Sequence, residues 1–214
     1  EVDTAVKQIK PDLIIVVAYG VILPESITNH YFCLNVHASL LPQYRGPSPI
    51  HYALLNGDQK TGVTLIQLIK EMDAGDMLIQ KEIQINHEDT LETLSRKISA
   101  LGAQLCIDFI EQQWKTDQIQ KTAQDHNNAT YCKLIQKSAY EINPKNPITT
   151  TYNQIRAFSP NPGAFIVQNN KRIKILEARI ENDELMPVIV KPEGKKAMNY
   201  SDYCLGHPEG IHLC

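Results

Sequence analysis

The feature that most constrains the fold is an unbroken apolar run at residues 13–18 (LIIVVA), which ends at Tyr19 and Gly20. A strand that is apolar at every position, rather than at every second one, is typical of a parallel sheet covered on both faces. Further strand-like runs lie at residues 33–37, 63–69 and 77–85, and helical patterns lie at residues 22–30, 50–56 and 91–114. The sequence therefore predicts an α/β fold with a sheet that is at least partly parallel.

The longest helix predicted from the sequence covers residues 91–114. Asp89 and Glu92 have the spacing of a capping box, in which two side chains cap the first turn reciprocally. Apolar residues recur at helical spacing along this segment, at Leu91, Leu94, Ile98, Leu101, Leu105 and Ile110. We expect this stripe to be core and to carry no chemistry.

The composition changes after Trp114. Residues 115–130 are rich in Gln, Asn, Thr and Asp, which predicts a linker. Beyond it, a helical pattern at residues 149–158 and a Pro-rich turn precede strand-like runs at residues 164–168, 172–178 and 187–191. We therefore expect a first domain at residues 1–114 and a small, β-barrel-like second domain at residues 131–214.

The bulk properties are those of a globular protein in a reducing compartment. The 214 residues suffice to bury a core, and no apolar run approaches the roughly 20 residues that cross a bilayer. The five cysteines are scattered without a Cys-x-x-Cys pair, which indicates free thiols and a cytoplasmic location. The chain begins without an initiator Met or a signal-peptide pattern, so we expect it to be part of a longer protein.

Charge is unevenly distributed along the chain. Residues 130–214 carry 11 Lys and Arg against 8 Asp and Glu, a net +3, whereas residues 1–129 carry 10 against 16, a net −6. A positive second half is either ordinary variation of a solvated surface or a face that meets a polyanion. The charge pattern alone leaves both interpretations open.

Three polar residues could carry chemistry. Asn35 and His37 are two positions apart on a predicted strand, so their side chains point to one face, at a strand end where α/β folds bind ligands. The Asn amide could donate to an oxyanion, and the His could move a proton. Asp73, on a Gly-containing turn, could orient His37 and favour its protonated form. Alternatively, His37 is structural and Asp73 only forms an Asx turn.

Competing motifs are weak. The sequence has no nucleophile elbow and no phosphate-binding Gly loop. A zinc tetrad is suggested only superficially, by Cys204, His207, His212 and Cys214. Because these four residues lie in a Gly- and Pro-containing terminal segment, we expect a solvated tail and no metal site.

Two segments carry a resemblance to a known family. Residues 35–46 (NVHASLLPQYRG) and 72–78 (MDAGDML) closely resemble the signature of the folate-dependent formyltransferases. The resemblance implies a Rossmann-like, mostly parallel catalytic domain, with Asn35, His37 and Asp73 as catalytic residues and 10-formyltetrahydrofolate as formyl donor. It also implies folate contacts from Ser39, Leu40, Leu41 and Pro42, and a pterin pocket lined by Val17, Tyr19 and Gly20.

Motifs in the second half of the chain indicate which molecule accepts the formyl group. Residues 129–131 (ATY), 155–164 (IRAFSPNPGA) and 191–198 (KPEGKKAM) resemble the members that formylate the methionine carried by initiator tRNA. In those members, an OB-like C-terminal domain helps to hold the tRNA, which makes Lys195 and Lys196 the leading candidates for phosphate contacts. Arg45 is a further candidate, either for an RNA phosphate or for the glutamate carboxylate of the folate.

The resemblance also implies a mechanism without a covalent enzyme intermediate. The α-amino group of methionine attacks the formyl carbon, Asn35 and His37 stabilise the oxyanion, and His37 with Asp73 moves the proton to the departing folate nitrogen. We expect a cytoplasmic monomer, bacterial or from an organelle of bacterial descent, that binds folate and initiator methionyl-tRNA. The alternatives are a sugar-nucleotide N-formyltransferase, a formyltetrahydrofolate hydrolase and a non-catalytic RNA-binding module.

The sequence departs from the family pattern at two places. Family members have a first strand, a Gly-containing turn and further βα units before the equivalent of Pro11, and this chain has no counterpart to them. If the chain is a fragment, we expect marginal stability and little activity, because central strands lose neighbours. Strand-forming sequence is also compressed between Ile180 and Pro187, which indicates a hairpin of the barrel that is either deleted or missing from the given sequence.

Overall fold

The computed structural model describes residues 2–213 and divides the chain into two compact units. The first unit comprises residues 1–49, 60–84 and 96–134, and the second comprises residues 50–59, 85–95 and 135–214. The units therefore interleave along the chain. A division into functional domains at residues 114 and 131 stays a prediction.

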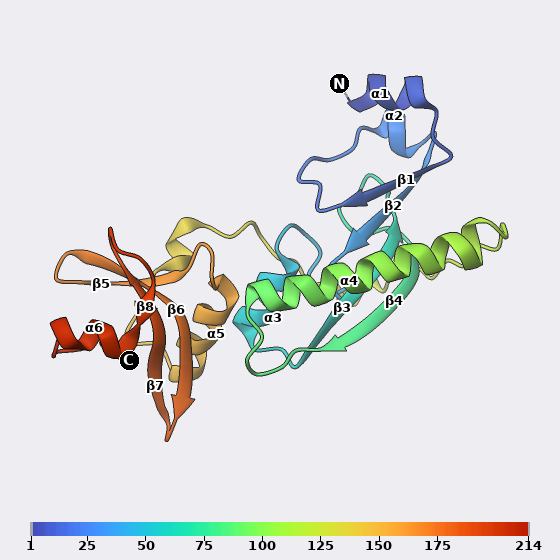
Figure 1. Ribbon diagram of the computed structural model, residues 1–214. Helices are drawn as coiled ribbons and strands as arrows, with labels where there is room; N and C mark the ends of the chain where they lie inside the picture. Colours follow the sequence, from blue (N-terminus) through green and yellow to red (C-terminus); the bar gives the residue numbers. More distant parts are fainter. Residues whose placement is uncertain (1, 214) are drawn as a thin grey trace. The chain divides into compact units, whose positions relative to one another are not determined.

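The first unit is built on a four-stranded sheet in the order β1-β2-β3-β4 (Figure 1). Its strands are β1 (Leu13–Val17), β2 (Phe32–His37), β3 (Lys60–Gln67) and β4 (Met77–Gln84). β1 pairs with β2 in parallel, and β3 is antiparallel to both of its neighbours, so three of the four strands run in one direction. The prediction of an α/β fold with a mostly parallel sheet is confirmed, with β3 as the exception.

The helical segments are α1 (Val2–Ile9), α2 (Glu25–Thr28), α3 (Pro49–Asn56), α4 (Leu91–Phe109), the π-helical η1 (Ile110–Trp114), the 3₁₀ turns η2 (His126–Asn128) and η3 (Lys137–Tyr140), α5 (Ile148–Phe158) and α6 (Tyr200–Gly206). None of the helices between residues 2 and 213 combines the length and apolarity needed to cross a membrane. Leu94, Ile98 and Leu105 of α4 are buried, which confirms the core stripe predicted for this helix.

The cap of α4 is one residue away from its predicted position. Thr90 Oγ1 accepts from Thr93 N at 3.3 Å, and Thr90 N donates to Thr93 Oγ1 at 3.0 Å. These reciprocal bonds form the capping box, with Thr90 as N-cap in place of Asp89. Asp89 instead supports the loop, because its Oδ2 accepts from Asn86 N at 2.7 Å.

β1 is not buried on both faces as the sequence predicted. Val17 is 60% exposed, and Ile15 is also exposed. Within the described residues β1 has one strand partner, β2, so it forms an edge of the sheet. Its apolar side chains line an open hollow of about 240 Å³, together with residues of α1 and α2.

The segment predicted as a linker packs on the first unit. Thr122 forms an isolated antiparallel bridge with Met77, and Arg45 N donates to Thr130 O at 2.9 Å. The polar residues of segment 115–130 therefore include groups that bond to this unit as well as groups that face water.

The second unit contains an antiparallel sheet in the order β5-β6-β7-β8 (Figure 1). Its strands are β5 (Ala164–Gln168), β6 (Lys171–Glu181), β7 (Glu184–Pro192) and β8 (Met198–Asn199). α5 contributes Ile155 and Phe158 to a buried core that also contains Ile175 and Val190. Among the described residues, β5 and β8 are the two edges of this sheet.

The sequence between Ile180 and Pro187 forms the tip of the β6–β7 hairpin. Asn182 and Asp183 join the strands, and both have positive φ angles, as a two-residue hairpin turn requires. The sequence pattern did not predict this hairpin, because exposed charged residues at its tip conceal the strand pattern.

Candidate active site

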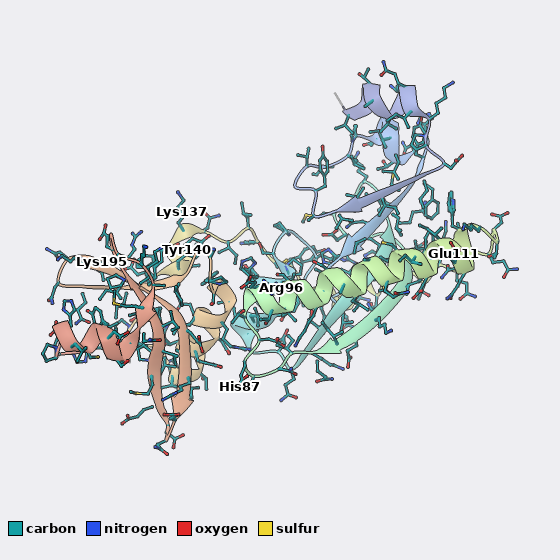
Figure 2. All side chains as sticks on the ribbon, viewed as in Figure 1. His87, Arg96, Glu111, Lys137, Tyr140 and Lys195 are labelled. Carbon is teal, nitrogen blue, oxygen red and sulfur yellow. The ribbon has the colours of Figure 1, made fainter. Side chains whose placement is uncertain are left out.

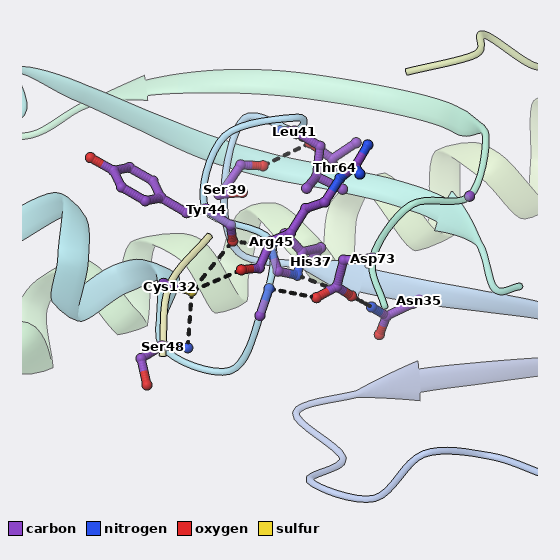
Figure 3. A network of polar contacts seen from close by, with 12 residues as sticks. Asn35, His37, Ser39, Leu41, Tyr44, Arg45, Ser48, Thr64, Asp73 and Cys132 are labelled. Carbon is purple, nitrogen blue, oxygen red and sulfur yellow. Dashed lines mark hydrogen bonds and ion pairs between the residues drawn. The ribbon is translucent and has the colours of Figure 1, made fainter. Parts of the chain in front are cut away.

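Asn35, His37 and Asp73 meet at the end of β2 (Figure 3). Asn35 and His37 lie two positions apart on this strand, and Asp73 reaches them from the turn between β3 and β4. Asn35 Nδ2 donates to Asp73 Oδ1 at 3.3 Å, and His37 Nδ1 lies 3.6 Å from the same oxygen. The structure therefore brings together the three residues that the sequence indicated as catalytic.

The other ring nitrogen of His37 is held by the backbone. His37 is only 5% exposed, and its Nε2 lies 2.9 Å from the carbonyl oxygen of Tyr44. Because a carbonyl can only accept, Nε2 carries a hydrogen and donates it. A neutral His37 then has a bare Nδ1, which faces Asp73 and is able to take a proton.

The Asp73 carboxylate has a second anchor. Gly46 N donates to Oδ2 at 2.8 Å, which leaves Oδ1 to Asn35 and His37. Only glycine suits this position, because φ is +116° and an added Cβ would lie 2.2 Å from the carbonyl oxygen of Cys132. Glycine at position 46 therefore allows the loop backbone to approach closely enough to donate to the Asp73 carboxylate.

Residues 122–132 complete the site, although the sequence analysis did not place them there. Gln124 Nε2 donates to the carbonyl oxygen of Asp73 at 2.8 Å. Burial raises the pKa of the Cys132 thiol, and the negative charge of Asp73 raises it further, so this is a packed thiol and not a nucleophile. The only sequence feature that pointed to this segment was the ATY motif at residues 129–131. It indicated the family but not the contacts of Gln124 and Cys132 with the site.

The segment expected to contact folate is largely interior. Ser39 and Leu41 are buried, and Leu40 and Pro42 are half-buried. Ser39 Oγ donates to a carbonyl oxygen of the same loop, and Leu41 N donates to Thr64 Oγ1 at 3.1 Å. Ser39 and Leu41 therefore support the loop from inside.

Val17, Tyr19 and Gly20, which were expected at a pterin pocket, lie at and after the end of β1. Tyr19 is 46% exposed, and no atom lies within 4 Å of the Cβ position of Gly20. Val16 pairs with Asn35 in the sheet, so the end of β1 lies beside the candidate catalytic residues. A ligand in front of Asn35 would therefore have the open end of β1 next to it.

Arg45 is buried, at 2% exposed, and its guanidinium is used within the chain. Nε and Nη2 donate to Gln124 Oε1 at 3.0 and 2.7 Å, and Nη1 lies 3.5 Å from the hydroxyl of Tyr131. Arg45 also lines the hollow described below, and its contact with an RNA phosphate or a folate carboxylate stays a prediction.

Lys195 and Lys196 are exposed in the segment between β7 and β8, and Lys195 is labelled in Figure 2. Lys174 and Lys191 lie directly opposite each other on β6 and β7. Lys174 Nζ donates to the carbonyl oxygen of Pro162 at 2.6 Å, which offsets the repulsion between like charges at directly opposite positions.

A hollow of about 690 Å³ adjoins the Asp73 turn. Met72 and Ala74, which flank Asp73, line it together with Ile69 and Tyr131. Polar and charged residues, including Arg45, Glu71, Asp76 and His126, also line this hollow, so its volume and mixed lining suit a small organic ligand that carries polar groups.

Among residues 2–213, no group of three or more His, Cys, Asp or Glu side chains is arranged to hold a metal ion. Cys214, one of the residues that suggested a zinc tetrad, lies outside the described residues. His207 stacks on Tyr203, with ring centroids 4.4 Å apart, and its Nδ1 lies 3.5 Å from Glu209.

Two family models match the chain. The formyl transferase model matches residues 1–110, and the model of the formyl transferase C-terminal domain matches residues 134–187. A methionyl-tRNA formyltransferase from Ehrlichia ruminantium (strain Gardel) is 36% identical over 228 residues, covering 94% of this chain and 73% of the relative. The chain belongs to the methionyl-tRNA formyltransferase family. It is therefore an enzyme of formyl transfer, and the family indicated by the sequence motifs is confirmed.

Solved structures share the fold of this formyltransferase chain. A methionyl-tRNA formyltransferase from Clostridium thermocellum is 23% identical, with a TM-score of 0.74 over 89% of this chain and 81% of that chain. WlaRD, a sugar 3N-formyltransferase solved in the presence of dTDP and 5-N-formyl-THF, is 22% identical, with a TM-score of 0.66 over 87% of this chain and 71% of that chain. At these identities the likeness establishes the fold alone.

Proposed function

We propose that the chain transfers the formyl group of 10-formyltetrahydrofolate to the α-amino group of methionyl initiator tRNA. The observation that carries the proposal is the convergence of Asn35 and His37 on one oxygen, Asp73 Oδ1. An amide, an imidazole and a carboxylate are what an acyl transfer needs to stabilise an oxyanion and move a proton. The family's name supports the acceptor, and WlaRD, solved with 5-N-formyl-THF, supports a folate donor.

The first step is attack of the neutral amine on the formyl carbon. A new N–C bond forms, and the carbonyl oxygen becomes an oxyanion. Asn35 Nδ2 has two hydrogens, of which one is donated to Asp73 and the other remains for the oxyanion. A donor of this kind contributes about 3–4 kcal/mol to stabilisation of the transition state.

The second step is transfer of the proton to the leaving group. The bare Nδ1 of His37 takes the proton that the attacking nitrogen must lose, and it returns that proton to the folate nitrogen as the C–N bond breaks. The Nε2–H bond to the Tyr44 carbonyl holds the ring, and the Asp73 carboxylate stabilises the transient imidazolium. Protons balance, and the enzyme forms no covalent bond to the formyl group.

The hollow beside Asp73 is the proposed entry for the reactants. It is open, it includes both neighbours of Asp73, and Ile69 and Tyr131 give it apolar surface for ring systems or an aminoacyl side chain. The aminoacyl end and the folate then approach the catalytic residues along the Asp73 turn.

The second half of the chain is proposed to hold the tRNA. The net positive charge of residues 130–214 and the exposed Lys195 and Lys196 suit a phosphate backbone. In this assignment residues 1–114 are catalytic, residues 115–130 connect, and residues 131–214 bind RNA. We place the protein in the cytoplasm as a monomer.

A comparison of acceptors in separate reactions tests this function. The protein is incubated with formyl-labelled 10-formyltetrahydrofolate and either charged initiator tRNA, a sugar-nucleotide amine or no acceptor. We expect label on the methionine of the tRNA and little in the other two reactions. Label on the sugar amine but not on the tRNA would replace this proposal with a sugar N-formyltransferase. Release of formate at the same rate in every reaction would indicate a hydrolase.

A further inference from the structure

The side-chain amide of Gln124 is fully hydrogen-bonded and connects the Asp73 turn to Arg45. Its Nε2 donates to the carbonyl oxygens of Asp73 and Gly75 at 2.8 and 2.7 Å. Its Oε1 accepts from Arg45 Nε and Nη2 at 3.0 and 2.7 Å. The residue is only 5% exposed, so these four bonds replace bonds to water.

Arg45 fixes which way the Gln124 amide points. A guanidinium only donates, and the two turn carbonyls only accept. The amide can therefore satisfy both sides in one orientation, with its oxygen on Arg45 and its nitrogen on the turn. Reversing it would place donor against donor on one side and acceptor against acceptor on the other.

The turn to which Gln124 is hydrogen-bonded has an unfavourable backbone conformation. Asp73 has a φ of +51°, in the left-handed region that a residue with a Cβ rarely adopts. Gly75 is packed so closely that an added Cβ would lie 1.8 Å from the carbonyl oxygen of Gln67. Such a backbone persists only where its surroundings hold it, and Gln124 bonds to it at both Asp73 and Gly75.

We propose that Gln124, oriented by Arg45, is a positioning residue that holds the Asp73 carboxylate in register with Asn35 and His37. It acts through the backbone of the turn and touches no reacting atom. The inference rests on the proposed catalytic role of Asp73. It assigns Arg45 to the support of the active site.

Gln124→Glu is the decisive substitution. Glu has nearly the same shape and keeps an oxygen for Arg45, but it places a carboxylate oxygen where the two turn carbonyls need a donor. We expect kcat to fall about tenfold to a hundredfold, as small misplacements of catalytic groups do, with a smaller change in KM. Gln120→Glu is the matched control, because Gln120 is exposed on the same segment and should keep wild-type kcat.

A double-mutant cycle separates positioning from general stability. In an Asp73→Asn background, Gln124→Glu should lower kcat by less than about twofold, because the group that it positions is already lost. If Gln124→Glu costs the same factor in both backgrounds, Gln124 acts independently of Asp73 and the inference is wrong. If Asp73→Asn alone is as active as wild type, it is the proposed catalytic role of Asp73 that fails.

A measurement without substrates tests the same geometry. Gly46 N donates to Asp73 Oδ2 at 2.8 Å, so the Gly46 amide signal in a ¹H–¹⁵N NMR spectrum reports the position of the carboxylate. Gln124→Glu should move this signal upfield and speed its hydrogen exchange, whereas Gln120→Glu should leave it unchanged. An unchanged Gly46 signal together with wild-type kcat in Gln124→Glu would overturn the inference.

Discussion

Replacement of Asp73 by Asn tests the proposed mechanism with a change of one atom. In the native site Oδ2 accepts from Gly46 N, while Oδ1 accepts from Asn35 Nδ2 and faces His37 Nδ1. An Asn side chain has one oxygen and one NH₂ group, so it can serve only one of these two sides. If its oxygen stays on Gly46, its NH₂ opposes the Asn35 amide and donates to the bare Nδ1, which occupies the base. If it is reversed, its NH₂ opposes the Gly46 amide.

Either arrangement of the substituted side chain removes the carboxylate that supports a protonated His37. Loss of general acid–base catalysis lowers rates by about 100- to 10,000-fold, which is an increase of about 3–5 kcal/mol in the activation barrier. Binding of folate and tRNA draws on other contacts, so we expect kcat to carry most of the loss and both KM values to change by less than about threefold.

Single-turnover formylation of methionyl initiator tRNA measures the effect without interference from product release. Asp12→Asn is the matched control, because Asp12 is an exposed carboxylate of the same unit and should keep wild-type turnover. Thermal melts of both variants establish that the folded fraction is equal. A folded Asp73→Asn variant that retains kcat within about threefold of wild type would refute the role of Asp73 as a catalytic group.

Three further predictions concern the pH dependence of stability, the backbone at Gly46 and the proposed RNA contacts. Burial lowers the pKa of His51 below its ordinary value of 6.5. Its contribution to stability is therefore fully present above about pH 6.5 and is lost as the pH falls below that value. His51→Phe should flatten the acid side of a urea-stability profile. Gly46→Ala should destabilise the protein by about 1–3 kcal/mol in urea titrations, because an added Cβ would overlap a backbone carbonyl, whereas Gly20→Ala, with no atom within 4 Å, should be nearly neutral. Replacing Lys195 and Lys196 by Ala should weaken tRNA binding and reduce the slope of log K against log salt by about 1–2, and a slope equal to that of wild type would exclude phosphate contacts by this pair.

Local periodicity predicted most elements of the fold, and the errors arose where tertiary context decides. The apolar run of β1 predicted a strand correctly, but its burial depends on neighbouring elements, and Val17 is exposed because β1 is an edge within the described residues. The N-cap of α4 is Thr90 and not the predicted Asp89. Both residue types cap helices well, so only the backbone geometry selects one.

The three candidate catalytic residues were predictable because β2 fixes two of them on one face and the family motifs supply the third. The position of Gln124 in the site was not predictable. The sequence does not distinguish a Gln that donates to buried carbonyls from one that faces water, and the residues around Gln124 have the composition of a linker. The burial of Arg45 was not predictable either, because Arg is rarely buried without partners and the sequence does not show which residues those are. Its partner, Gln124, comes from a segment 79 residues away along the chain.

In the proposed mechanism, the oxygen Asp73 Oδ1 links proton uptake by His37 to oxyanion stabilisation by Asn35. While Nδ1 of His37 is bare, Oδ1 accepts a hydrogen from Asn35, and the 3.6 Å gap to His37 separates two electron-rich atoms. Once Nδ1 takes the proton of the amine it becomes a donor to Oδ1, and the Asn35 amide is then freer to donate to the oxyanion. Proton uptake by His37 and oxyanion binding by Asn35 should therefore be coupled through one atom.

This coupling predicts that the two residues are not additive. Asn35→Ala and His37→Ala should each lower kcat strongly, but the double variant should be more active than the product of the single effects by about fivefold or more, a coupling of about 1 kcal/mol. Single-turnover rates of the four proteins give this value directly. If the double variant matches the product within about 0.5 kcal/mol, Asn35 and His37 act independently and a shared Oδ1 does not connect them.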